Sequence, residues 1–197
     1  MEKPFLTDIT ELRSRARKHI ESGAVTDNYR GDRDTVLRVL NEALATEIVC
    51  VLRYKRHYFM ATGVEATAAA EEFAEHAADE QKHADQIAAR ITQLGGEPNF
   101  NPEGLVSRSH SEYVAGTSTQ EMLREDLVAE RIAIESYTEF IQYLGDKDPT
   151  TRRLMEEILA KEEEHADDLA DMLIRFDQPR TGSSPPKSGK GKGQAAE

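Results

Sequence analysis

The 197-residue sequence contains one cysteine, Cys50, and no tryptophan, and aromatic residues make up only 6% of it. A single cysteine excludes an internal disulfide and any zinc or iron centre held by four cysteines of one chain. No apolar run approaches the roughly 20 residues of a membrane-spanning helix, and the N-terminus lacks the apolar stretch of a secretory signal. We therefore expect a cytoplasmic protein without a membrane partner.

Basic residues are also scarce, with 25 Lys and Arg against 37 Asp and Glu, which gives a net charge of −12. Residues 180–197 hold four basic side chains and one acidic one, so the rest of the chain carries −15. Such a body repels nucleic acid and attracts cations. DNA binding is therefore expected to be weak or absent. The Gly-, Pro- and Lys-rich tail, 178–197, is predicted to be disordered.

The sequence does contain four long segments in which apolar residues recur every three or four positions, a spacing that predicts amphipathic helices. They cover about 34–62, 66–94, 118–144 and 148–176. Short turns separate the first from the second and the third from the fourth, whereas 95–117 is long enough to cross the whole bundle. We predict an all-α fold, an antiparallel four-helix bundle over 34–177 with a long crossover between its second and third helices. Residues 1–33 form an N-terminal extension with a short helix over 8–21, and a further short helix is predicted within 105–113.

Each apolar seam is interrupted by ionisable residues. The first seam, for example, runs through Leu40, Leu44, Glu47, Val51, Tyr54 and Tyr58. Six such residues are predicted to point into the core: Glu47, Glu80, His83, Glu130, Glu162 and His165. An unpaired buried carboxylate costs several kcal/mol unless it is neutralised. Two divalent metal ions, with a total charge of +4, would neutralise four carboxylates at once.

The arrangement repeats along the chain. Glu47 precedes the Glu80-x-x-His83 pair, and Glu130 precedes a second Glu-x-x-His pair, 162–165, at a nearly equal distance. This is the ligand pattern of di-iron and di-manganese carboxylate bundles, which also have one long crossover. The alternative is a plain bundle whose glutamates flank the seams, and it would have to apply to four helices together.

The segments around these residues resemble bacterioferritin and the wider ferritin-like superfamily. The resemblance rests on Leu40-Asn-Glu-Ala-Leu-Ala-Thr-Glu47 with Tyr54 and His57, on 79–85, on 94–99, on 122–130 and on 162–165, and it covers about residues 34–176. It implies a ferroxidase centre in which the six residues are the catalytic metal ligands. The centre would hold two iron ions per subunit, with manganese as the alternative metal, and would use dioxygen or hydrogen peroxide. The family's pattern makes Glu80 and Glu162 the bridging ligands, but the spacing equally permits Glu47 and Glu130.

Two departures from bacterioferritin carry information. Gln81 stands where those proteins have the methionine that ligates haem, so no haem is expected. The chain ends in a Gly-, Pro- and Lys-rich tail where 24-subunit cages have a fifth helix. This resembles the Dps-like group, and a homo-oligomeric 12-subunit cage is expected, with 24 subunits as the alternative.

We therefore expect an Fe(II)-oxidising protein of iron storage and detoxification. The alternatives are a non-cage di-iron or di-manganese peroxidase or catalase, and a DNA-protecting Dps-type protein. Around the centre, Tyr54 and Tyr137 are predicted either to bond to ligand carboxylates or to fill the seam. Cys50 is predicted to be an inert buried thiol, Asp79 and Glu75 to face solvent rather than bind iron, and the remaining histidines to have no metal role: His19, His57, His76 and His110.

Overall fold

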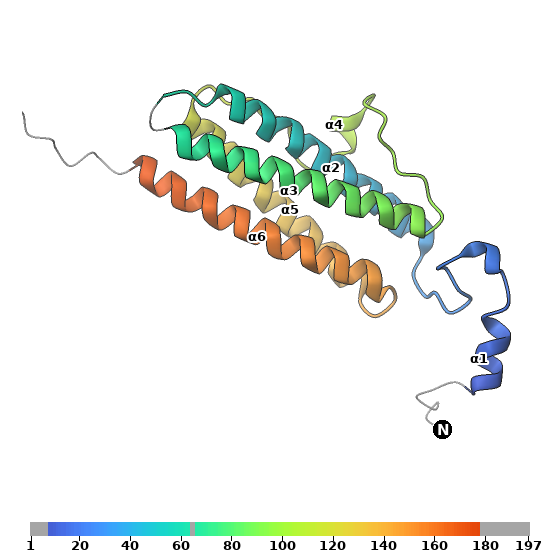
Figure 1. Ribbon diagram of the computed structural model, residues 1–197. Coiled ribbons are helices and arrows are strands. Elements are labelled where there is room, and N and C mark those ends of the chain that lie inside the picture. The colour runs from blue at the N-terminus through green and yellow to red at the C-terminus, as the bar shows by residue number, and fades with distance from the viewer. Residues whose placement is uncertain (1–7, 64–65, 178–197) are drawn as a thin grey trace, which may run out of the picture.

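The computed structural model describes residues 8–63 and 66–177, and in these ranges it contains helices and loops but no strand. Four long helices lie side by side (Figure 1): α2 (Arg33–Met60), α3 (Thr67–Gln93), α5 (Thr119–Leu144) and α6 (Pro149–Asp177). This confirms the predicted all-α four-helix bundle. Across the described ranges, no helix has the length and hydropathy that crossing a membrane requires.

The bundle consists of two antiparallel helix pairs, α2 with α3 and α5 with α6, and the helices of each pair follow each other closely in sequence. The connection between the pairs, 94–118, runs beside α2 and contains the four-residue helix α4 (Leu105–Arg108), a short helix within the predicted range 105–113. At the other end of the sequence, the predicted helix over 8–21 is split into α1 (Ile9–Arg15) and η1 (Ile20–Ser22). The division into an extension, a bundle and a tail stays a prediction, and the tail lies outside the described residues.

The helix ends follow the capping residues in the sequence. The Ser118 hydroxyl accepts a hydrogen bond from the Glu121 backbone N–H at 3.2 Å, which satisfies a free donor in the first turn of α5. The Asp148 carboxylate does the same for Thr151 at 2.9 Å, and Pro149 opens α6 as predicted. These caps fix where the second helix pair begins and therefore the register of its inward-facing residues.

The hydrophobic core is divided into two clusters. The larger one, with Leu40, Ile87 and Met155, lies toward the turn between α5 and α6, and the smaller one, with Phe73 and Leu169, lies toward the opposite end of the bundle. Full burial of each such side chain contributes about 1.5–3 kcal/mol. The polar residues between the two clusters are therefore shielded from solvent.

The seam predicted for α2 is wrong at its last position. Tyr58 is 41% exposed, and His57, one residue earlier, is fully buried instead. After Tyr54 the inward face continues with a step of three residues rather than four, since 3.6 residues per turn require both steps. The imidazole of His57 therefore occupies the interior where the phenol ring of Tyr58 was expected.

Candidate metal centre

The six ionisable residues predicted to share one centre come together between the two apolar clusters. Helix α2 contributes Glu47, α3 contributes Glu80 and His83, α5 contributes Glu130, and α6 contributes Glu162 and His165. None is more than 4% exposed. Their donor atoms form two overlapping groups, within each of which all atoms lie less than 4.8 Å apart, and Glu80 and Glu162 belong to both groups.

The two imidazoles are placed alike, each with its Nδ1 atom facing three carboxylates. From His83 Nδ1 the distances are 2.9 Å to Glu162 Oε1, 3.4 Å to Glu47 Oε2 and 3.6 Å to Glu80 Oε2. From His165 Nδ1 they are 3.5 Å to Glu162 Oε2, 3.6 Å to Glu80 Oε1 and 3.9 Å to Glu130 Oε1. The centre therefore has two similar halves that share a pair of carboxylates.

Most of the donor atoms at the centre make no hydrogen bond. The buried atoms without a partner include Glu47 Oε2, Glu80 Oε1, His83 Nδ1, both carboxylate oxygens of Glu162, and His165 Nδ1. A buried polar atom left unpaired costs about 1–3 kcal/mol, and more when it is charged. The orphaned atoms come from α2, α3 and α6 and face one another. Their types, carboxylate oxygen and imidazole nitrogen, suit Fe(II) and Mn(II).

The protonation of these residues follows from their crowding. Burial and the negative charge of Glu80 raise the pKa of Glu47, and burial with the same charge raises that of Glu130. Burial also opposes ionisation of Glu80, but the close approach of Glu47 and both imidazoles holds its pKa below the ordinary value. Although burial disfavours imidazolium, the surrounding carboxylates raise the pKa of His83 to about 12 and that of His165 to about 9. Without metal, protons therefore take the place of cations.

Comparisons with known proteins bear on this arrangement. The ferritin-like domain family matches residues 37–178. The chain belongs to the ferritin-like family. The bacterioferritin of Mycobacterium leprae is 33% identical over 150 residues, which is 76% of this chain and 89% of the relative. The bacterioferritin of Desulfovibrio desulfuricans is 32% identical over 131 residues, covering 66% and 69%.

Solved structures agree with this assignment. A dodecameric thioferritin, the bacterioferritin-related protein from Bacteroides fragilis, superposes with a TM-score of 0.72 at 32% identity, covering 75% of this chain and 89% of that one. Dps from Thermosynechococcus elongatus gives a TM-score of 0.70 at 18% identity, covering 77% and 96%, and so shares the fold. The ferritin-like fold and the iron storage and ferroxidase family are thus shown for this chain.

In this ferritin-like bundle two tyrosines connect helices α2 and α5 in a reciprocal way. The Tyr54 hydroxyl, from α2, donates to Glu130 of α5, and the Tyr137 hydroxyl, from α5, donates to Glu47 of α2. Both tyrosines are at most 2% exposed. The predicted bonds to carboxylates are therefore confirmed, and they orient the two glutamates that are not part of a Glu-x-x-His pair.

His76 is a neighbour of the centre to which the sequence assigned no role. Its ring stacks on that of His165 with 3.9 Å between centroids, and its Nδ1 lies 3.2 Å from the Tyr54 hydroxyl. A signal was present, because His76 lies one helical turn before Glu80 on the same seam. Asp79 is a further neighbour of the centre. Its carboxylate lies 3.3 Å from Lys161 Nζ and 3.5 Å from His165 Nε2.

A second buried polar cluster was missed entirely. Arg53 Nε donates to Asp126 Oδ1 at 2.7 Å, and the other carboxylate oxygen of Asp126 lies 2.7 Å from His57 Nδ1. Arg53 also donates to the Ser111 hydroxyl, and the second ring nitrogen of His57 lies 3.0 Å from the Ala115 carbonyl, both in the crossover. We call these three helical residues, Arg53, His57 and Asp126, the Arg53 cluster. It ties the crossover to α2 and α5.

Cys50 and Gln81 have different surroundings. Cys50 is 3% exposed and packs in the smaller apolar cluster, and burial raises the pKa of its thiol. It is therefore a buried thiol in its neutral form, as predicted. Gln81 is exposed on α3 and donates a hydrogen bond to Asp85 at 3.1 Å.

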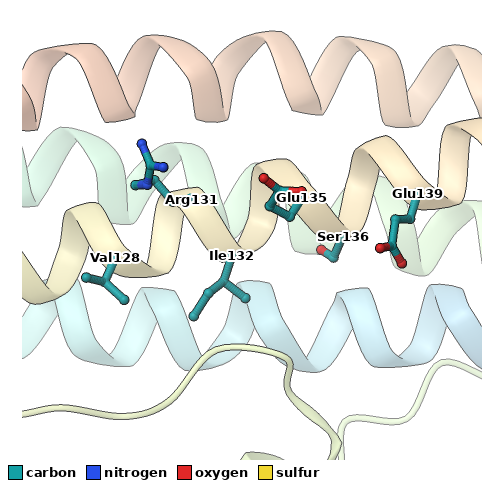
Figure 2. A pocket seen from close by; sticks show the side chains of 6 residues that line it. All are labelled: Val128, Arg131, Ile132, Glu135, Ser136 and Glu139. Atoms are coloured by element: carbon teal, nitrogen blue, oxygen red, sulfur yellow. The ribbon is translucent and has the colours of Figure 1, made fainter.

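An open hollow of about 490 Å³ lies along the outer side of α5, away from the centre. Figure 2 shows the side chains that line it: Val128, Arg131, Ile132, Glu135, Ser136 and Glu139. These side chains come from one helix and include no histidine or cysteine. The chemistry available to the chain is therefore concentrated in the buried centre.

Proposed function

We propose that this protein is a ferroxidase that binds two Fe(II) ions per chain and oxidises them with dioxygen or hydrogen peroxide, for iron storage and detoxification. The observation that supports it most strongly is the set of orphaned buried donor atoms contributed by α2, α3 and α6. Membership of the ferritin-like family favours iron over other divalent metals. Two Fe(II) ions bound in one site supply the two electrons that an oxidant such as peroxide needs.

The proposed ligands divide between the two ions. Glu80 and Glu162 are assigned as bridging ligands, because each belongs to both donor groups. One ion would be held in addition by Glu47 and the imidazole of His83. The other would be held by the corresponding pair from the second half: Glu130 and His165. This follows the family's pattern and makes the alternative, with Glu47 and Glu130 as bridges, less favourable.

The chain's own residues prepare the site in two ways. The hydroxyls of Tyr54 and Tyr137 hold the two non-bridging glutamates in place, which lowers the cost of ordering them when Fe(II) binds. Ligand atoms must also be free of protons, so binding releases the protons held by His83 and His165. The apolar clusters on either side keep bulk water from competing for the ligands.

We further propose a homo-oligomeric cage. A dodecameric relative at 32% identity supports twelve subunits, with 24 as the alternative. Weak or absent DNA binding and the absence of haem stay predictions. Size-exclusion chromatography with light scattering tests the cage, because twelve chains of 22.1 kDa give a particle of several hundred kilodaltons. A monomer or dimer would favour the alternative of a non-cage di-iron or di-manganese peroxidase or catalase.

Stopped-flow oxidation of Fe(II) tests the activity. The wild-type protein should oxidise two Fe(II) ions per chain rapidly with at least one of the two oxidants. Glu80→Ala and Glu162→Ala should abolish this phase while circular dichroism shows an intact helical bundle. Glu163→Ala, an exposed neighbour on α6, is the matched control and should oxidise iron at the wild-type rate. Wild-type rates in both core variants would contradict the proposal.

A further inference from the structure

Helix α1 buries none of its seven residues in the single chain, and it lies beyond the end of the bundle (Figure 1). Its two apolar side chains, Ile9 and Leu12, are 56% and 47% exposed. Because they are three positions apart, they lie on one face of the helix. A helix of this length is marginal in water unless such a face packs against another surface. The single chain does not supply that surface.

The residues that follow this apolar face are basic. The segment from Arg13 to His19 contains four Lys and Arg residues and no Asp or Glu. Within the described part of the chain, neither Arg13 nor Lys18 forms an ion pair. From its N-terminal to its C-terminal end, the segment 9–18 therefore presents apolar side chains first and uncompensated positive charge next.

The open hollow on α5 has a complementary lining (Figure 2). Its first part contains Val128, which is 45% exposed, and Ile132. Its second part contains the exposed residues Glu135 and Glu139, and the lining also includes Arg131. In the ranges that the structure describes, neither glutamate forms an ion pair. The hollow therefore offers apolar contact at one end and uncompensated negative charge at the other.

The two surfaces match in order and in length. On both α1 and α5, the apolar pair precedes the charged residues along the chain. At about 1.5 Å per residue, 128–139 spans about 16 Å, and a helical segment 9–18 would span about 14 Å. A parallel alignment of the two segments therefore places apolar side chains against each other and basic residues against acidic ones.

Helix α1 does not lie against α5 of its own chain (Figure 1). The residues after it are fixed at the end of the bundle, because Val25 and Tyr29 pack against the larger apolar cluster. The Tyr29 hydroxyl also donates to Asp148 at 3.0 Å. Gly23, with a φ of +58°, lies between this anchor and α1, which leads away from the bundle. An arm held in this way is placed to meet a neighbouring molecule.

We propose that α1 docks in the α5 hollow of a second copy of the chain. The proposal rests on the homo-oligomer proposed above, but not on the metal centre or on the number of subunits. Exposed ion pairs contribute little individually, so the apolar contact supplies most of the attraction, and the charges favour one orientation. Nucleic acid fits less well, because the apolar face of α1 would stay exposed and the net charge of −12 opposes binding.

Disulfide trapping in the full-length oligomer tests this docking. After mild oxidation, Leu12→Cys/Ile132→Cys should link two chains, which gives a species of at least twice 22.1 kDa on a non-reducing gel. Peptide mapping by mass spectrometry identifies the linked sites. The matched control is Ser14→Cys/Ile132→Cys, because Ser14 is exposed on the opposite face of α1. It should give at least about tenfold less of the link, since cysteines that point apart cannot be bridged. Single variants and the wild type account for links between identical sites and for Cys50.

Two further variants sharpen the test. Ile9→Cys/Val128→Cys covers a shift of one helix along the other, and should also link two chains. Adding Glu139→Lys to the first cysteine pair tests the charge complementarity, and should lower the yield of the link about threefold, as expected for an exposed ion pair. Glu163→Lys, an equal change of charge on the exposed face of α6, should leave the yield unchanged.

The outcomes separate this docking from the other proposals. A link between chains in either cysteine pair that exceeds the Ser14→Cys control supports it. A link within one chain, or an equal yield in the control, overturns it. If neither pair is linked while light scattering shows an oligomer, the docking is wrong and the homo-oligomer is not. A monomer overturns both and leaves the di-metal proposal untouched. A DNA gel shift that Arg13→Ala/Arg17→Ala abolishes, without any link between chains, overturns the docking in favour of nucleic acid.

Discussion

The bundle buries two clusters of charged residues whose chemistry differs. In the Arg53 cluster, which begins six residues after Glu47 on α2, the carboxylate of Asp126 meets a guanidinium and an imidazole at hydrogen-bonding distance. In the metal centre, four carboxylates surround two imidazoles, and most donor atoms lack partners. The first cluster is complete within the chain, whereas the second needs ions that the chain does not supply. Burial of charge alone therefore does not indicate function; the informative feature is whether the charges are satisfied.

The largest expected effect on stability comes from breaking the satisfied cluster. Asp126→Asn keeps the shape of the side chain but leaves Arg53, which is 1% exposed, without a counter-charge. We expect a loss of about 3–5 kcal/mol in the free energy of unfolding, measured by urea denaturation of the metal-free protein. Arg124→Ala, exposed on the same helix, should stay within about 0.5 kcal/mol of the wild type. A stability for Asp126→Asn close to that of the wild type would mean that the pairing is unimportant.

An intermediate effect is expected from pH on the metal-free centre. The folded-state pKa values of His83 and His165, about 12 and about 9, lie above the unfolded value near 6.5. Their contribution to stability is therefore full below about pH 6.5 and is lost as pH rises through the folded values. Between pH 6.5 and 9 the metal-free protein should lose on the order of 2 kcal/mol, since these groups share their protons.

Urea denaturation at a series of pH values measures this loss, and metal provides the control. With saturating Mn(II) in place of protons, stability should no longer fall over pH 6.5–9, because deprotonation strengthens metal binding. If the metal-free protein instead became more stable as pH rose, protons would not hold the empty centre together.

The smallest effect on stability is expected at the unsatisfied centre itself. Glu47→Gln removes a carboxyl group whose pKa is raised by burial and by the charge of Glu80. Because that group is largely neutral without metal, the free energy of unfolding of the metal-free protein should change by less than about 1 kcal/mol, or rise. Fe(II) oxidation should nevertheless be lost. A destabilisation as large as that of Asp126→Asn would remove the contrast between the two clusters.

The same contrast explains what could be predicted from the sequence. The six residues of the centre interrupt regular apolar seams, and their i, i+3 pairing and twofold repeat are visible without a structure. The Arg53 cluster has no such regularity, since Arg53 and Asp126 are 73 residues apart and meet only after the helix pairs assemble. The burial of His57, where Tyr58 was predicted to point inward, has a similar origin. Whether a helix takes a step of three or four residues at its end depends on the neighbour it meets.

His76 illustrates a further limit. Its position on the seam was visible, but its stacking on His165 depends on how α3 and α6 face each other. Periodicity reports which face of a helix is inward. It does not report which residues of different helices meet at the same height.

The division of ligands between the helix pairs has a consequence for assembly. Each donor group draws on both pairs: the group with Glu47 and His83 also requires Glu162, and the group with His165 also requires Glu80. Neither half of the chain, 8–94 or 118–177, therefore contains a complete set for even one ion. With the proposed ligand set, a chain with correctly docked helix pairs should retain metal, and a collapsed chain with misdocked pairs should not. A cell that distributes iron to newly made subunits would load only those that had finished folding.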